Sequence, residues 1–157
     1  MKPNSFIRYL IGLTILVCIA SCNRGEVYYK FLPIHKNEWS KNQKICFLLD
    51  SSSITVNKNY AIALELSHNT TYQYQNLFLI LEHTLQDSIP SNDTIEIVLM
   101  DDLGNWRGTG NGATRQLSQL YKSSIKIDTA LHNEITVRHA MQDLKLKGIE
   151  KIGLKIY

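Results

Sequence analysis

Cysteine is scarce in this chain, which contains only three, at positions 18, 22 and 46. Cys18 lies in an apolar segment near the N-terminus, and Cys22 follows that segment. Only Cys46 remains in the body of the chain, which excludes an internal disulfide there. Its neighbours Ile45 and Phe47 are apolar, so we expect Cys46 to be an unpaired, buried residue of a strand and not a nucleophile.

The N-terminal region also lacks an apolar run that is long enough to cross a membrane. The apolar run there covers residues 9–20, whereas a membrane-spanning helix needs about 20 apolar residues. Lys2 and Arg8 precede the run and small residues follow it, which is the pattern of a cleaved secretory signal. Because Cys22 comes directly after the small residues, the segment resembles the lipobox of bacterial lipoproteins. That resemblance implies that Cys22 carries a diacylglycerol and, after cleavage, an amine-linked fatty acid such as palmitate.

We therefore divide the chain into a signal peptide (residues 1–21), a lipidated tether with an edge segment (22–38) and a folded domain (39–157). Two simpler readings of the N-terminus stay open. Cys22 could be an ordinary thiol behind a conventional signal peptide, or the segment could be an uncleaved anchor.

Net charge is low once the signal is removed. The formal charge is +3, and Lys2 and Arg8 supply two of these charges. The sequence contains no arginine-rich arm or basic patch with aromatic residues, so we expect no nucleic-acid partner. The five histidines are dispersed and lack the spacing of a metal site. We expect no metal, no cofactor and no catalytic residues.

Apolar and polar residues alternate along most of the chain, which predicts β-strands. Seven strands, or eight with the first edge segment, follow from this pattern: residues 26–31, 45–49, 60–66, 77–81, 95–100, 121–127, 135–138 and 152–156. Glu65 and Glu82 should face solvent. The continuous apolar run at 77–81 predicts a strand that is buried on both faces.

This strand pattern predicts an all-β antiparallel sandwich. Jelly-roll and immunoglobulin-like topologies both fit it. One short helix is expected at 139–147, where Ala140 and Leu144 would share a face before Gly148 ends it.

Two further sets of residues suggest carbohydrate. Trp39 and Trp106 could stack on sugar rings at an exposed surface, and the alternative is that they are core residues. Ser88, Thr94 and Thr129 each follow an aspartate and precede a small or apolar residue. Such triplets resemble the protein O-glycosylation sites of Bacteroidetes, although turn chemistry alone also explains them.

Several short motifs after the lipobox occur together in a known order, and they extend over nearly the whole mature chain. They are Val27-Tyr28-Tyr29, Trp39-Ser40, Tyr60-Ala61-Ile62, the strand at 76–80, the turn at 105–110, Ala140-Met141, Gly148-Ile149 and the strand at 152–156. In these features the chain resembles the GldH family of gliding-motility lipoproteins of Bacteroidetes.

The resemblance implies a non-enzymatic, lipid-anchored protein of the cell envelope. Its partners would be other motility proteins and proteins of type IX secretion. Asn23-Arg24-Gly25 lacks the acidic run that resembles a surface-export signal, so we expect the anchor in the outer membrane with the domain facing the periplasm. A carbohydrate-binding surface lipoprotein that uses Trp39 and Trp106 is the alternative.

Overall fold

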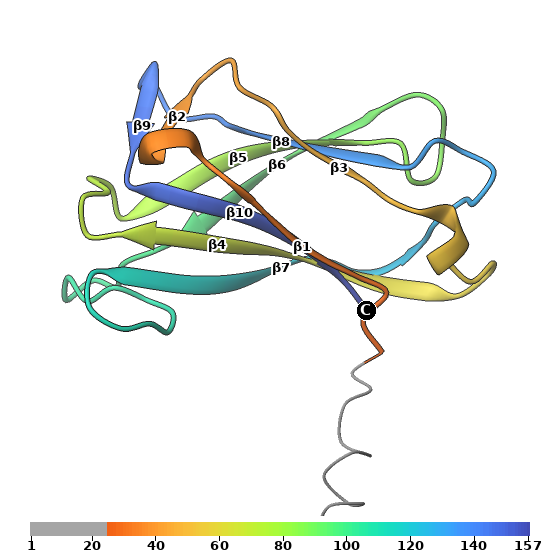
Figure 1. Ribbon diagram of the computed structural model, residues 1–157, viewed down its shortest axis with the longest axis horizontal. Helices are drawn as coiled ribbons and strands as arrows, with labels where there is room; N and C mark the ends of the chain where they lie inside the picture. Colours follow the sequence, from red (N-terminus) through yellow and green to blue (C-terminus); the bar gives the residue numbers. More distant parts are fainter. Residues whose placement is uncertain (1–24) are drawn as a thin grey trace, which may run out of the picture.

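The computed structural model describes residues 25–157 (Figure 1). Cys22 and the predicted signal peptide lie outside the described residues. The elements are β1 (Tyr28–Pro33), η1 (His35–Asn37), β2 (Glu38–Ser40), β3 (Ile45–Leu48), η2 (Ser51–Ser53), β4 (Asn59–Asn69), β5 (Asn76–His83), β6 (Ser91–Val98), β7 (Thr114–Lys126), β8 (Glu134–His139), β9 (Lys145–Lys147) and β10 (Ile149–Ile156). Every predicted strand has a counterpart among them.

Eight of the strands form two four-stranded antiparallel sheets. Sheet I has the order β1-β10-β4-β7 and sheet II has the order β3-β8-β5-β6. The two sheets form two layers in Figure 1. Numbered along the chain without the short β2 and β9, the strands run 1-8-3-6 in one sheet and 2-7-4-5 in the other. This is the order of a jelly roll, so the structure decides between the two topologies that the sequence left open.

The core lies between the two sheets and follows from the alternation of the strands. From β4 it receives Tyr60, Ile62, Leu64 and Leu66, and from β5 it receives Leu77, Leu79 and Leu81. The prediction that 77–81 is buried on both faces is wrong. Phe78 is exposed and Ile80 is only partly buried, because the outer face of sheet II is not covered by another element of the described chain.

The predicted helix at 139–147 is also wrong. His139 ends β8, and Lys145–Lys147 form β9, which pairs with β2 in a separate two-stranded ribbon. Trp39 lies opposite Leu146 in this ribbon, and both are buried. Leu144, expected on the packed face of the helix, is 78% exposed. Pairing with a distant strand therefore buries Leu146 more completely than a local helix could.

Two single residues also differ from expectation. Cys46 is exposed, because its neighbours Ile45 and Phe47 take the inward positions of β3. Glu65 is buried although it points outward from β4, and Ser118 Oγ donates a hydrogen bond of 2.8 Å to its carboxylate. A position on the outer face of a sheet therefore does not by itself mean contact with water.

Among residues 25–157, the structure has no helix that is long and apolar enough to cross a membrane.

Candidate functional site

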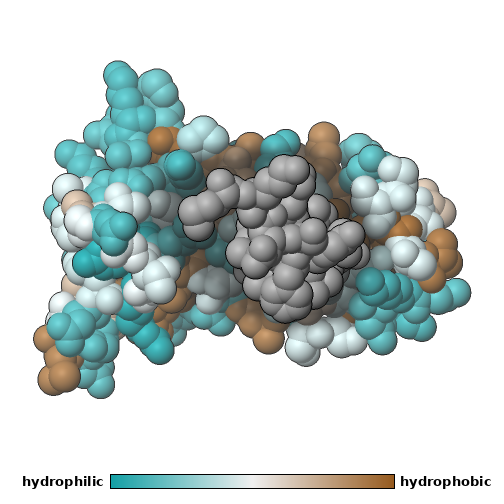
Figure 2. All heavy atoms as spheres, turned by 60° about the horizontal axis from the view of Figure 1, so that its bottom comes forward, coloured by the Kyte–Doolittle hydropathy of each residue, from teal (hydrophilic) through white to brown (hydrophobic). Residues whose placement is uncertain are grey.

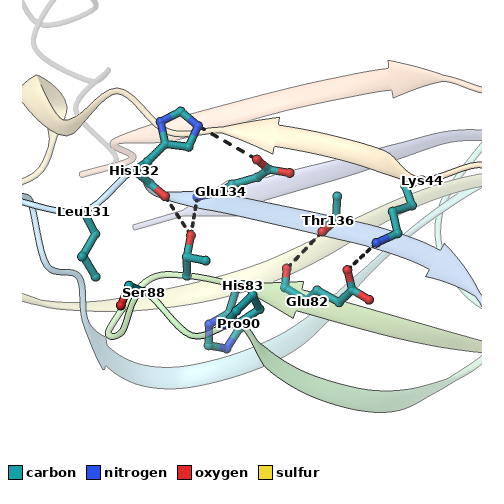
Figure 3. A pocket seen from close by; sticks show the side chains of 10 residues that line it. Lys44, Glu82, His83, Ser88, Pro90, Leu131, His132, Glu134 and Thr136 are labelled. Carbon is teal, nitrogen blue, oxygen red and sulfur yellow. Dashed lines mark hydrogen bonds and ion pairs between the residues drawn. The ribbon is translucent and has the colours of Figure 1, made fainter.

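A shallow pocket of about 360 Å³ opens on the outer face of sheet II (Figure 3). Its floor comes from β5 and β8, which contribute Glu82, Glu134 and Thr136. Lys44, just before β3, stands at one side, and Figure 3 shows its amine directed at Glu82. The other side is formed by the loops that follow β5 and precede β8, which contribute His132.

Strand alternation explains why these polar side chains meet. Leu81 of β5 points into the core, so Glu82 next to it points outward. Ile135 of β8 is likewise buried, which turns Glu134 and Thr136 to the outer face. The register then places Glu82 opposite Thr136. The pocket therefore brings together polar side chains from segments that lie far apart in the sequence.

Both carboxylates of the pocket already have partners. Lys44 Nζ lies 2.6 Å from Glu82 Oε2. Cys46 Sγ donates a hydrogen bond of 3.1 Å to Glu134 Oε1, and His132 Nε2 lies 4.0 Å from Glu134 Oε2. The Lys44–Glu82 pair holds a positive and a negative group side by side. The pocket therefore suits a polar ligand or a partner surface that carries charges of both signs.

Two hydrogen bonds of Thr84 fix the loop side of the pocket. Its hydroxyl donates to the His132 carbonyl oxygen at 2.8 Å and accepts from the Glu134 amide nitrogen at 3.2 Å. Pro90 and Leu131 add apolar surface beside these groups. This side of the pocket therefore has a fixed shape and presents both polar and apolar surface.

The one thiol near the pocket is poorly suited to nucleophilic chemistry. Partial burial and the hydrogen bond to the Glu134 carboxylate raise the pKa of Cys46 to about 11. A thiol with that pKa is almost entirely protonated at neutral pH, and the thiolate is the reactive form. Among residues 25–157, no cluster of three or more histidine, cysteine or acidic side chains is arranged to hold a metal ion. Neither this thiol nor a metal cluster among the described residues therefore supplies the pocket with a reactive group.

The comparison with known proteins assigns the chain to a family. The sequence profile described as GldH lipoprotein matches residues 26–156, which is nearly all of the part of the chain that the structure describes. The chain belongs to the GldH lipoprotein family.

Two curated relatives agree with this family. The gliding motility lipoprotein GldH homolog of Christiangramia forsetii is 29% identical over 160 residues, which cover 98% of this chain and 96% of that protein. The gliding motility lipoprotein GldH of Flavobacterium johnsoniae is 24% identical over 157 residues, which cover 92% and 94%. The similarity therefore extends over nearly the whole length of both relatives.

One solved structure is similar over 82% of this chain but over only 33% of its own. It is titled "Structure of infectious bursal disease virus Gx strain", with 14% identity and a TM-score of 0.28. A score this low does not indicate a shared fold.

The two tryptophans of this GldH-family protein lie outside the pocket. Trp39 is completely buried, donates its indole N–H to the Gln43 carbonyl oxygen at 3.0 Å and packs edge-on against His139. Trp106 is half-buried and packs against His68 with 4.9 Å between ring centroids. The expectation of an exposed stacking surface is therefore wrong for Trp39, because its ring is part of the core.

The three hydroxyls of the predicted glycosylation triplets are spread over the surface. Ser88 is exposed and lines the pocket, and its hydroxyl lies 3.3 Å from the Asp87 carboxylate. Thr94 is exposed on β6, and Thr129 is half-buried in the loop between β7 and β8. The structure therefore brings only Ser88 into the pocket.

Sequence reasoning missed Lys44, His132 and Glu134 as members of one site. None of them belongs to a recognisable motif, and they come from β8 and from the segments before β3 and β8. The available signal was the alternation of β8, which predicts that Glu134 and Thr136 share one face. Only the pairing of β8 with β3 and β5 brings Lys44 and Glu82 to the same place.

Proposed function

We propose that this protein is a lipid-anchored, non-enzymatic component of the gliding-motility and type IX secretion-associated machinery of the cell envelope. The observation that carries the proposal is the GldH family match at 26–156, which begins directly behind a lipobox-like segment that ends at Cys22. The names of both relatives, which are gliding motility lipoproteins, support the motility role. The paired charges of the sheet II pocket support a binding role in place of a catalytic one.

The anchor is tested by replacing its cysteine. Cys22→Ser should abolish incorporation of labelled fatty acid and release the protein from the membrane fraction, because the acyl chains supply the membrane affinity. Cys46→Ser is the matched control, since it removes the other cysteine of the mature chain and should leave labelling unchanged. Labelling that persists in Cys22→Ser would contradict a lipid on this residue.

The proposed location is the outer membrane, with the domain in the periplasm. The support is the segment Asn23-Arg24-Gly25, which lacks an acidic run after Cys22. Protease added to intact cells should leave the protein whole, and protease added after the outer membrane is opened should digest it. Digestion on intact cells would place the domain on the cell surface instead.

The pocket of sheet II is the proposed contact with another envelope protein. Glu82→Lys combined with Glu134→Lys should reduce co-purification of motility proteins and slow colony spreading, because the substitutions reverse both acidic groups of the pocket. Glu96→Lys is a matched control, since Glu96 lies on β6 of the same sheet but does not line the pocket. Equal effects of the two changes would contradict a specific role of the pocket.

A strain that lacks this protein tests the proposed role in the gliding-motility and secretion machinery. Loss of gliding or of secretion in that strain supports the proposal, and normal gliding together with normal secretion contradicts it.

O-glycosylation at Ser88, Thr94 and Thr129 is a separate proposal, which rests on the three sequence triplets and on the exposure of Ser88 and Thr94. The intact mass of the native protein tests it. Added sugar masses that disappear in Ser88→Ala, Thr94→Ala and Thr129→Ala would support it, and the unmodified polypeptide mass would rule it out.

A further inference from the structure

Large apolar side chains are exposed together on the outer face of sheet I. Tyr29 is 51% exposed, Leu120 is 50% exposed and Tyr157 is 42% exposed. Phe31 lies beside Tyr29, with 5.5 Å between the ring centroids. We name Tyr29, Phe31, Leu120, Lys155 and Tyr157 the aromatic face. Contiguous apolar surface of this kind marks a site of contact with protein or membrane.

The register of sheet I shows that these residues share one face. Tyr29 pairs with Lys155, Lys155 with Ala63 and Ala63 with Leu120, so one row crosses all four strands. The core residues Leu64 and Leu154 alternate with this row on the opposite face. Tyr157 lies opposite Ala61, joined to it by two main-chain hydrogen bonds.

Lys155, the cation within the aromatic face, is already neutralised. Lys155 Nζ lies 2.8 Å from Glu26 Oε1, and this interaction raises the pKa of Lys155. The amine also lies 5.8 Å from the Tyr29 ring centroid and 5.1 Å from the Tyr157 ring centroid. A paired charge between two tyrosines costs less to bring to a headgroup region than a free charge, and tyrosine is enriched at such interfaces.

The chain connects this face to the proposed anchor over a short distance. Only four residue steps separate Cys22 from Glu26, and an extended chain of that length spans about 14 Å. Glu26 is itself bound to Lys155 within the aromatic face. In Figure 1 the first described residues lie at the lower side of the molecule, next to the end of β10, and Figure 2 turns that side forward. A lipid on Cys22 would therefore enter the bilayer close to this face.

The opposite face of the sandwich is a poorer membrane surface. The outer side of sheet II also exposes Leu48, Phe78 and Val98. It additionally carries the charged groups of Lys44, Glu82, Glu134 and the exposed Glu96, which would lose water on contact with lipid. Sheet II would then point away from the membrane, which leaves its pocket open to a partner.

We propose that the aromatic face rests on the bilayer that holds the Cys22 anchor, with its tyrosines at the level of the lipid headgroups. The inference depends on the lipidation stated under the proposed function. The occupant is the bilayer itself, and a second protein copy on this face is an outcome that the test separates.

The experiment uses the full lipidated protein in vesicles of phosphatidylethanolamine and phosphatidylglycerol, at a low ratio of protein to lipid. A spin label is placed at Leu120→Cys in sheet I or at Val98→Cys in sheet II, each with Cys46→Ser, since the Cys22 thiol is occupied by lipid. Leu120 and Val98 are both exposed aliphatic residues on edge strands, so they form a matched pair. Tyr29→Cys gives a second position on the aromatic face.

Collisions of the label with oxygen and with a water-soluble nickel chelate report its surroundings. The label at 120 should show at least a threefold higher ratio of oxygen to nickel accessibility than the label at 98. Equal, water-like ratios at both positions in protein that floats with vesicles would overturn the proposed orientation while leaving the anchor intact. Shielding of position 120 from both reagents would overturn it in favour of a protein contact. If the protein does not float with the vesicles, the lipid anchor on Cys22 is contradicted. The proposed orientation, which depends on that anchor, is then contradicted as well.

Discussion

The ring of Phe31 lies directly over Gly153 on the outer face of sheet I. A Cβ atom added to Gly153 would come within 2.8 Å of the ring atoms Cδ1 and Cε1 of Phe31, and within 2.9 Å of Glu65 Cβ. Phe31 and Gly153 are paired residues of β1 and β10, and Gly153 is paired with Glu65 of β4. The ring of the edge strand thus occupies the space that a side chain on its neighbour would take.

Gly153→Ala should lower the free energy of unfolding by about 1–3 kcal/mol, because the new methyl group overpacks a filled site. Urea denaturation of the purified domain measures this loss. Phe31→Ala should reduce the cost of Gly153→Ala when both are combined, since the ring is then gone. The same cost in both backgrounds would show that Phe31 is not the obstacle.

Tyr121 of β7 donates a hydrogen bond to the Asp93 carboxylate of β6, and this links the two sheets at one edge of the sandwich. Lys122 Nζ lies 2.8 Å from the same carboxylate. Tyr121→Phe should cost about 1–3 kcal/mol of unfolding free energy, because it removes a bond to a charged acceptor and keeps the ring. Tyr157→Phe, at an exposed position, should change the value by less than about 0.5 kcal/mol. A similar small effect at both positions would contradict the link.

The Asp93 carboxylate also makes the stability of the protein depend on pH in the acid range. Its bonds to Lys122 and Tyr121 hold the pKa of Asp93 below its usual range. A lowered folded-state pKa contributes stability above the pKa of the unfolded chain, and this contribution is lost as the pH falls through the folded-state value. Asp93→Asn should therefore lower the free energy of unfolding at neutral pH. The same substitution should have little effect at the acid end of a series of unfolding measurements at different pH values. A constant effect from pH 7 to pH 3 would contradict this coupling.

Three histidines, His68, His83 and His139, are buried in the sandwich, and burial lowers the pKa of each. The folded state therefore binds protons less readily than the unfolded chain. As far as these histidines determine it, the free energy of unfolding should be highest above about pH 6.5, the ordinary histidine pKa. It should decrease as the pH falls below that value. The melting temperature at pH 7.5 and at pH 5 measures this decrease.

His68 offers the clearest variant. Among residues 25–157, neither ring nitrogen of His68 or of His83 has a hydrogen-bond partner, but His83 also lies 3.9 Å from the Asp93 carboxylate. His68→Phe keeps an aromatic ring beside Trp106 and removes the titrating group, so the pH-dependent decrease should shrink. His132→Asn is the control, because His132 is 80% exposed. An unchanged pH dependence in His68→Phe would show that this histidine is not among its sources.

Cys46 should react slowly despite its exposure. With a pKa of about 11, its thiolate fraction at pH 8 is roughly two-hundredfold below that of an ordinary thiol with a pKa near 8.5. Iodoacetamide alkylation followed by mass spectrometry measures the rate. Glu134→Gln should accelerate it, because the carboxylate accepts the thiol hydrogen bond, and Glu82→Gln should leave it unchanged. Fast alkylation of the unaltered protein would contradict the raised pKa.

The sequence alone determined the local elements of this protein. Alternation in β4 and β10 identified strands because one face of each meets the core, and the order of short motifs after Cys22 identified the GldH family. The signal-like segment predicted the anchor. The strands and the signal need only residues that are near one another in the chain, and the family assignment needs only the order of motifs along it.

Tertiary structure alone decided what depends on partners distant in sequence. Leu146 became part of a strand because Trp39, more than a hundred positions earlier, pairs with it. Glu65 is buried although it points outward from its strand, and Cys46 is exposed although its strand is apolar. Alternation states which residues share a face, but strand order and edge position determine what covers that face. The jelly-roll order, the pocket of sheet II and the aromatic face of sheet I all follow from long-range pairing that no local pattern encodes.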